Sequence, residues 1–193
     1  MRSSRVRTAI LISGRGSNMV ALAQSAQHPD HPAEICLVFS NDPEALGLQK
    51  AADMGIEVAA MDYQQFSTRE NFDSAMHEIL TAHNIQLICC AGYMRILSPW
   101  FTQQWPGRIL NIHPSLLPKY KGLNTHQRAI DAGDKEHGCT VHYVNEELDG
   151  GAIIMQDKTP ILPTDTAESL AQRMLTLEHA LYVKSLKQIA LNL

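Results

Sequence analysis

The fold is decided by the stretch Val6-Arg7-Thr8-Ala9-Ile10-Leu11-Ile12-Ser13-Gly14-Arg15-Gly16-Ser17-Asn18. Its first seven residues are largely apolar and β-branched, which predicts a buried strand. Two glycines then allow a tight turn, and a helical pattern follows over residues 17–27. A near-continuous apolar strand that runs directly into a helix is typical of a parallel sheet, because parallel strands are joined by helical crossovers.

The same alternation of strand and helix continues outward from this stretch. Further strands are expected at residues 35–39, 56–60, 85–91 and 108–112, and helices at 43–54, 68–82 and 99–105. Helix-start signals accompany them. Asp42-Pro43 and Ser98-Pro99 each place a capping side chain before a proline at the first helical position. Ser67 and Glu70 have the spacing of a capping box.

The second half of the chain changes character. We expect a helix at 124–132, two strands at 139–144 and 152–158 joined through residues 145–151, and a long final helix that Asp165 and Glu168 open and that runs to about residue 190. The pattern predicts one α/β domain over residues 1–193. Its mostly parallel, twisted sheet should carry helices on both faces and an antiparallel extension in the C-terminal half.

Composition excludes several classes of function. The chain has 193 residues and a net charge of −4, which argues against a general nucleic-acid binder. No apolar run approaches the roughly 18 residues of a membrane helix, and the run at 9–12 is too short for a signal peptide. The four cysteines show no CxxC spacing, so we interpret them as small buried hydrophobes rather than disulfides. We therefore expect a cytoplasmic protein.

The loop after the first strand predicts an anion site. Glycines let the backbone approach a ligand, free amides point outward at a helix start, and Arg15, Ser17 and Asn18 could add donors. A dinucleotide fingerprint would need glycine or alanine at the position of Met19, so a single phosphate fits better. The alternative interpretation is a turn that needs glycine only for its geometry.

Asn111 and His113 form the central pair of candidate catalytic residues. Strand side chains alternate, so both project from one face, and Pro114 ends the strand directly after them. Asn can donate to a developing oxyanion, and His titrates near neutrality. We hypothesise that Asp149, followed by two glycines, orients His113.

Other catalytic classes lack the residues that they need. There is no Gly-x-Ser-x-Gly nucleophile motif, and the nine histidines form no zincin-type pair, so we expect no metal. Direct transfer between two bound substrates therefore fits better than a covalent intermediate. Taken alone, Asn-x-His on a strand is more often structural, but the flanking Pro-Ser-Leu-Leu-Pro and the anion loop favour the catalytic interpretation.

The motifs together resemble the folate-dependent formyltransferase family. The resemblance is carried by Asn111-Ile112-His113-Pro114-Ser115-Leu116-Leu117-Pro118 and Leu148-Asp149-Gly150-Gly151. Residues 13–18, 91–97 and 121–126 are similar to the branch that formylates glycinamide ribonucleotide. The resemblance implies a Rossmann-like domain that moves a formyl group from 10-formyltetrahydrofolate to the amine of that ribonucleotide, the third step of purine synthesis. Residues 6–110 would form the ribonucleotide half, and residues 111–193 the catalytic and folate half.

The resemblance also implies roles for single residues. Asn111 would steady the oxyanion, His113 would handle protons and polarise the formyl group, and Asp149 would hold His113. The ribonucleotide would contact Arg15, Gly16, Ser17, Asn18 and Glu178, and the folate would contact Met94, Arg95, Ile96, Leu97 and Asn111 beside the 145–149 backbone. Arg69 and Arg108 are further candidates for anionic groups of the substrates. The implied partners are these two small molecules, without nucleic acid or membrane, and the chain would act as a monomer or homodimer.

The sequence departs from the family pattern at two positions, and it lacks features that related enzymes should carry. Lys121 stands where some relatives have proline, and Leu175 where some have a polar residue that contacts the ribonucleotide. A formyltetrahydrofolate hydrolase should carry a second histidine where Pro114 stands, and a methionyl-tRNA formyltransferase should carry a basic C-terminal domain. A non-catalytic phosphate binder would leave Asn111, His113 and Asp149 without a role.

Overall fold

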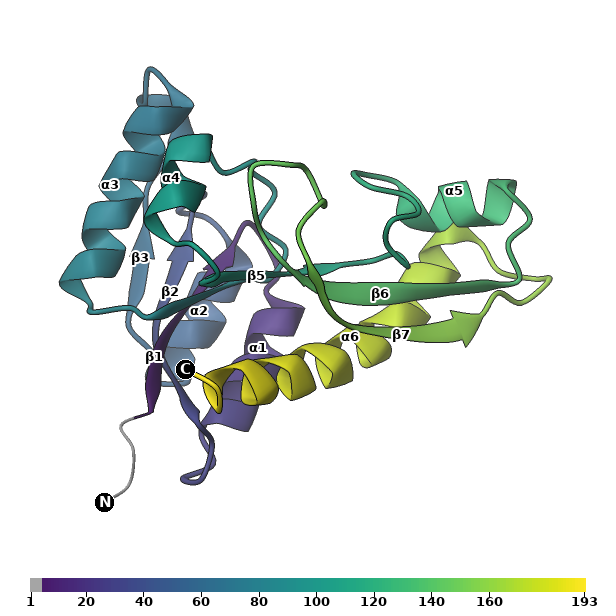
Figure 1. The fold of residues 1–193 in the computed structure, drawn as a ribbon, viewed down its shortest axis with the longest axis horizontal. Helices are drawn as coiled ribbons and strands as arrows, with labels where there is room; N and C mark the ends of the chain where they lie inside the picture. The colour runs from purple at the N-terminus through teal and green to yellow at the C-terminus, as the bar shows by residue number, and fades with distance from the viewer. Residues whose placement is uncertain (1–4) are drawn as a thin grey trace.

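A single seven-stranded sheet organises residues 5–193, the part of the chain that the computed structural model describes (Figure 1). The strands lie in the order β3-β2-β1-β4-β5-β6-β7. Their bounds are Val6–Ile12 (β1), Ala33–Ser40 (β2), Val58–Ala60 (β3), Leu87–Cys90 (β4), Ile109–His113 (β5), Glu136–Tyr143 (β6) and Ile153–Pro160 (β7). β1 to β5 are parallel, whereas β6 and β7 pair antiparallel with their neighbours. The expected parallel sheet with an antiparallel C-terminal extension is therefore confirmed.

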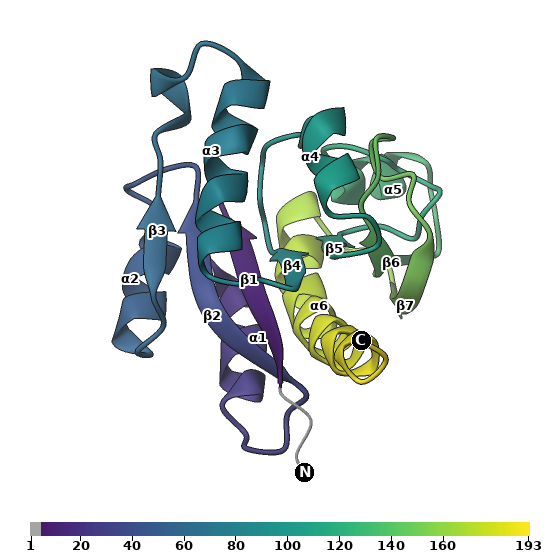
Figure 2. The ribbon, with the colours of Figure 1, turned by 60° about the vertical axis from the view of Figure 1, so that its left-hand side comes forward.

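Helices cover both faces of the sheet (Figure 2). They are α1 (Ser17–Ala26), α2 (Leu46–Asp53), α3 (Arg69–Ala82), α4 (Pro99–Gln104), α5 (Thr125–Asp131) and α6 (Ala167–Ala190), with a short 3-10 turn at Tyr63–Gln65. α1, α2 and α6 pack on one face, and α3 and α4 on the other. The expectation of helices on both faces is confirmed.

The two cores follow from the alternation of side chains along each strand. In β1, Ile10 and Ile12 face α1 and α6, whereas Ala9 and Leu11 face α3. All four are fully buried, as expected for a strand in the middle of a sheet that is covered on both sides. This explains why β1 has no polar face in the sequence.

Two expected helix starts need correction. α2 begins at Leu46 rather than Pro43, because Asp42 Oδ1 instead accepts the Glu44 N–H at 2.9 Å and forms a turn of its own. The capping box expected at Ser67 and Glu70 is wrong as well, since Thr68 is the N-cap of α3 and its hydroxyl accepts the Asn71 N–H at 3.1 Å.

The cap expected at Ser98 is confirmed, with Pro99 directly after it and the Ser98 hydroxyl accepting the Phe101 N–H. α6 opens with a capping box between Thr166 and Ser169. Asp165 lies just before this cap, where its carboxylate accepts the Leu162 N–H at 2.7 Å and meets the Arg173 guanidinium. These contacts hold the chain as it enters the last helix.

The strand order places a switch point beside β1. The chain leaves β1 towards β2 and β3, then returns to β4 on the other side of β1. Connections therefore diverge at the carboxyl ends of β1 and β4, which is where ligands bind in sheets of this type. The loops after β1, β4 and β5 meet at this edge.

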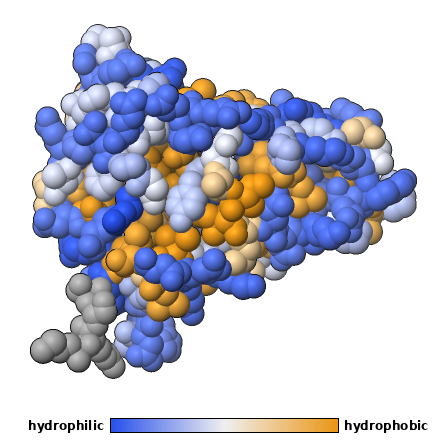
Figure 3. Space-filling view, viewed as in Figure 1, coloured by the Kyte–Doolittle hydropathy of each residue, from blue (hydrophilic) through white to orange (hydrophobic). Residues whose placement is uncertain are grey.

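The surface shown in Figure 3 is hydrophilic at both ends, and its apolar side chains gather along the middle, over β5 and α6. Within residues 5–193, no helix combines the length and the apolar character needed to cross a membrane.

Candidate active site

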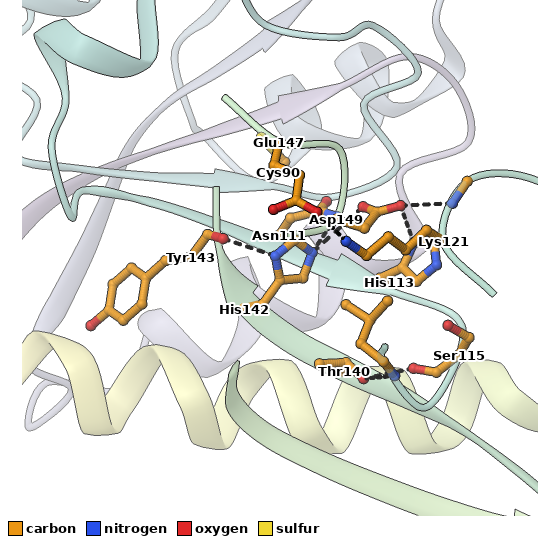
Figure 4. A network of polar contacts seen from close by, with 12 residues as sticks. Cys90, Asn111, His113, Ser115, Lys121, Thr140, His142, Tyr143, Glu147 and Asp149 are labelled. Atoms are coloured by element: carbon orange, nitrogen blue, oxygen red, sulfur yellow. Dashed lines mark hydrogen bonds and ion pairs between the residues drawn. The ribbon is translucent and has the colours of Figure 1, made fainter. Parts of the chain in front are cut away.

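β5 supplies the centre of the site. Asn111 and His113 lie two residues apart near its carboxyl end, between β4 and the antiparallel β6. The register pairs Asn111 with His142 and His113 with Thr140. The structure thus gathers an amide and two imidazoles at one place, with the 145–149 loop arriving from above (Figure 4).

Asp149 reaches His113 across 36 residues of sequence. Its Oδ2 lies 3.5 Å from His113 Nδ1, and both side chains are nearly buried. The same oxygen accepts the Gly122 N–H at 2.8 Å. The backbone amide fixes the carboxylate in front of the imidazole, where it can stabilise a positive charge on the ring.

The other ring nitrogen of His113 is also engaged. His113 Nε2 lies 2.9 Å from the Tyr120 carbonyl oxygen. A carbonyl can only accept, so Nε2 carries the proton and the neutral ring presents a bare Nδ1 towards Asp149. His113 can take up a second proton at Nδ1, beside a carboxylate that stabilises it.

His142 is a site residue that the motif search did not single out. Its Nδ1 donates to the Tyr143 carbonyl at 2.8 Å, which leaves Nε2 to accept from Asn111 Nδ2 at 3.2 Å. Burial lowers the pKa of His142, so the ring is neutral at pH 7 and remains an acceptor. The contact fixes the side-chain amide of Asn111, and its second N–H has no partner within residues 5–193, so it can donate to a ligand. Only the cross-strand register between β5 and β6 could have indicated this pairing.

Glycine lets the 145–151 loop approach so closely. A Cβ at Gly151 would collide with the Tyr143 carbonyl. Asp149 itself adopts a left-handed backbone with φ of 48°, which few residues besides glycine, asparagine and aspartate adopt. Such a conformation persists only where its surroundings hold it, and it turns the carboxylate towards β5.

A cleft opens beside Asn111 near the end of β5; we call it the β5 cleft. Its walls are Cys90, Tyr93, Arg95, Ile96, Leu97, Asn111, His142 and residues 144–149. The wall is mainly apolar, with polar groups at the β5 end. The Arg95 guanidinium stacks 3.1 Å from the Tyr63 ring centre, which holds this cation at the cleft wall.

A second cavity lies over the loop after β1; we call it the loop cavity. Residues 13–18 line it together with Ala91, Gly92, Met94 and Leu175. Met94 therefore lies in this cavity and is not part of the wall of the β5 cleft.

Asn18 connects this cavity to α6. Its Nδ2 donates to Glu178 Oε2 at 2.8 Å, whereas its buried Oδ1 has no partner among residues 5–193. Burial raises the pKa of Glu178, although the Asn18 bond opposes this shift. A buried carboxylate and an unpartnered amide oxygen suit a ligand that brings hydroxyl donors.

Two predicted site residues lie elsewhere. Arg108 precedes β5 and so sits at the amino edge of the sheet, where Nη1 donates to the Gln86 carbonyl. Arg69 is the exposed first residue of α3 and lines neither the β5 cleft nor the loop cavity. The contact of these two arginines with anionic groups of the substrates stays a prediction. Arg108 lies apart from the other candidates because of the direction of β5, since the whole length of the strand separates its amino end from its carboxyl end.

The described residues contain no cluster of three His, Cys, Asp or Glu side chains that could hold a metal ion.

Comparison with known proteins gives consistent matches. The family model described as formyl transferase matches residues 6–186. The phosphoribosylglycinamide formyltransferase of Haemophilus influenzae is 49% identical over 176 residues, covering 91% of this chain and 83% of that protein. The crystal structure of phosphoribosylglycinamide formyltransferase from Brucella melitensis superposes with a TM-score of 0.93 at 50% identity, covering 97% of this chain and 96% of that one.

A longer relative matches as well. The trifunctional purine biosynthetic protein adenosine-3 of Gallus gallus is 45% identical over 190 residues. These cover 98% of this chain, which spans only 19% of the length of that relative.

Proposed function

The chain belongs to the formyl transferase family, and we propose that it transfers the formyl group of 10-formyltetrahydrofolate to the amine of glycinamide ribonucleotide. The products are formylglycinamide ribonucleotide and tetrahydrofolate. The observation that carries the proposal is the cluster of Asn111, His113 and Asp149, of which Asn111 and Asp149 line one of two cavities that share the segment after β4 as a wall. A site for transfer between two substrates needs two such neighbouring cavities.

The two cavities suit the two substrates. The mainly apolar β5 cleft accepts the flat pterin of the folate between residues 95–97 and the 145–149 backbone. The loop cavity accepts the phosphate of the ribonucleotide through the amides of Gly16, Ser17 and Asn18 and the Arg15 side chain. Glu178 lies where it can accept from ribose hydroxyls. The reacting amine and formyl group then meet at Asn111.

The reaction proceeds by direct attack. The amine nitrogen forms a bond to the formyl carbon, and the C=O π electrons move onto the formyl oxygen. The free N–H of Asn111 donates to this oxyanion, which a fixed donor stabilises without reorganisation. His113 enters this step neutral, with Nδ1 free to take the proton that the attacking amine later releases, and Asp149 stabilises the imidazolium that then forms.

Collapse of the tetrahedral intermediate completes the transfer. The attacking nitrogen, now cationic, loses a proton through water to the His113–Asp149 pair. The carbon–oxygen double bond re-forms, the bond from carbon to N10 breaks, and N10 receives the proton. Proton handling by positioned groups typically contributes 10²–10⁴-fold to such rates. Alignment of two bound substrates contributes a further large share.

We propose a monomer or homodimer that acts in the cytoplasm on these small molecules, without nucleic acid or membrane. The ribonucleotide half is residues 6–110 with Glu178 added from α6, and the catalytic and folate half is residues 111–193. Glu178 joins the first half because α6 packs against α1.

The test mixes purified protein with both substrates and EDTA and follows the loss of the 10-formyltetrahydrofolate spectrum. Turnover that depends on glycinamide ribonucleotide is expected. Asn111→Ala should reduce kcat by about 10²–10³-fold, the usual effect of losing one oxyanion donor. Asn192→Ala, at the far end of the chain, should leave it unchanged. Absence of turnover by the parent protein overturns the proposal.

A further inference from the structure

Two hydrogen bonds from α2 hold the loop after β1, and each is accepted by a backbone carbonyl of the loop. The Gly47 N–H donates to the Gly14 carbonyl at 2.9 Å, and Lys50 Nζ donates to the Arg15 carbonyl at 2.8 Å. Gly47 lies in the first turn of α2, where backbone N–H groups have no partner within the helix. The backbone at the start of α2 and a side chain one turn later thus bind the carbonyls of two consecutive loop residues.

These two bonds fix the direction of two amide donors. A trans peptide is planar, so the carbonyl of one residue and the N–H of the next point in opposite directions. Because the Gly14 and Arg15 carbonyls face α2, the N–H groups of Arg15 and Gly16 point away from it. Neither N–H donates to any residue between 5 and 193.

The side away from α2 is the loop cavity. α2 follows β2, on one side of β1 in the sheet order, whereas β4 lies on the other side. The cavity wall opposite the loop comes from Ala91, Gly92 and Met94 after β4 and from Leu175 on α6. The two free N–H groups therefore face the cavity, and the left-handed Gly16 (φ 70°) gives the loop the shape of an anion-binding nest.

We propose that Lys50 is a positioning residue for phosphate recognition: it holds the Arg15 carbonyl away from the loop cavity, so that the loop presents only N–H donors and the Arg15 side chain to the ligand. The proposal rests on the proposed function only for the identity of the ligand. Without Lys50 the peptide group is free to turn, and its carbonyl dipole would then face the phosphate and repel it.

Gly47 supports the same arrangement by its lack of a side chain. A Cβ there would meet Ile12 Cδ1 at 2.5 Å and the Gly14 carbonyl oxygen at 3.0 Å. It would also lie 3.3 Å from Gly16 Cα, so the loop would have to move. Gly47→Ala thus perturbs the loop without a change of charge, whereas Lys50→Met removes the ammonium without adding bulk.

The first experiment measures phosphate binding directly. Ribose 5-phosphate and inorganic phosphate are titrated calorimetrically into the parent protein, Lys50→Met, Lys50→Arg, Gly47→Ala and Lys184→Met at one low ionic strength. Lys50→Met should weaken binding about tenfold, the usual effect of one charge-assisted hydrogen bond. Lys50→Arg should restore it, Gly47→Ala should also weaken it, and the exposed Lys184→Met on α6 should match the parent.

Steady-state kinetics give the second readout. In Lys50→Met the KM for glycinamide ribonucleotide should rise by the same factor, while kcat and the KM for 10-formyltetrahydrofolate stay constant. Equal phosphate affinity in the parent and Lys50→Met overturns the inference, as does an equal loss for the arginine variant or a parent that binds neither phosphate ligand. If the parent binds phosphate but catalyses no formyl transfer, the proposed function fails while the calorimetric comparison still decides the role of Lys50.

Discussion

Asp149 Oδ2 stands 3.5 Å from His113 Nδ1 while it accepts the Gly122 backbone N–H at 2.8 Å. The carboxylate thus ties its own loop, residues 145–151, to the loop after β5 and to the His113 imidazole. Its other oxygen, Oδ1, lies 3.7 Å from His142 Nε2. The carboxylate thus lies near both histidines of the site, and the close packing of the 145–151 loop against Tyr143 of β6 brings it there.

Replacing Asp149 by asparagine tests the charge of this contact. Asp149→Asn keeps the size of the side chain and an oxygen for the Gly122 N–H, but it cannot stabilise an imidazolium. We expect kcat to fall about 10²–10⁴-fold with little change in either KM. Steady-state rates measured between about pH 6 and pH 9 check this. A variant that matched the parent rate throughout this range would remove Asp149 from the mechanism.

His142 should act through Asn111. His142→Ala removes the acceptor that fixes the Asn111 amide, and kcat should fall about five- to tenfold, as for the loss of one neutral hydrogen bond. His28→Ala, an exposed histidine, is the control. The critical comparison is a double-mutant cycle. In an Asn111→Ala background the same change should have almost no further effect on kcat, and additive losses would contradict the assignment.

Tyr120 anchors the loop after β5, and its own backbone carbonyl accepts the hydrogen bond from His113 Nε2. Its hydroxyl donates to Asp134 Oδ2 at 2.7 Å, and its backbone is left-handed with φ of 57°. Tyr120→Phe should lower the free energy of unfolding by about 1 kcal/mol and reduce kcat severalfold, because the strained loop loses its tether. Urea unfolding and steady-state kinetics measure both. Tyr143→Phe is the control, since no hydrogen bond of its hydroxyl occurs within residues 5–193; equal behaviour of the two variants would refute the tether.

Glu178 should make stability depend on pH. Burial raises its pKa above the ordinary value of 4.5, so between 4.5 and the raised value the folded state binds more protons than the unfolded state. Stability is therefore lost as pH rises through this window. Glu178→Gln removes the effect and should be more stable than the parent at about pH 7.5, yet equal to it at about pH 4.

Urea unfolding at the two pH values measures this difference, with the exposed Glu78→Gln as control. The KM for glycinamide ribonucleotide should rise in Glu178→Gln, because the ribose loses a charged acceptor. Equal stability of the variant and the parent at both pH values would show that Glu178 does not lower the free energy of unfolding at neutral pH.

Short-range patterns gave correct predictions wherever the deciding interaction is local. Alternation along β5 and the proline after it placed Asn111 and His113 side by side. The buried strands and the cap at Ser98 also follow from neighbouring residues. The prediction that α2 starts at Pro43 is wrong, because Asp42 can cap a turn as well as a helix, and propensity alone does not separate the two.

Long-range placement was only partly predictable. The expected approach of Asp149 to His113 was a hypothesis from residue type, and the structure brings the two together. The His142 contact depends on the register between β5 and β6, which sets two residues 31 positions apart against each other. Arg108 looked as close to the site as Asn111 in sequence, but the direction of β5 carries it to the other edge.

The sequence by itself determined the parallel α/β sheet, the glycine loop after its first strand, and the Asn111–His113 pair, because periodicity, capping and turn chemistry act over a few residues. Tertiary structure decided which groups face them. It brought Asp149 and His142 to β5, set Glu178 against Asn18, and turned two loop carbonyls towards α2. Those contacts join residues 31 to 160 positions apart, where only the strand order, the register and the packing of both faces fix the distances.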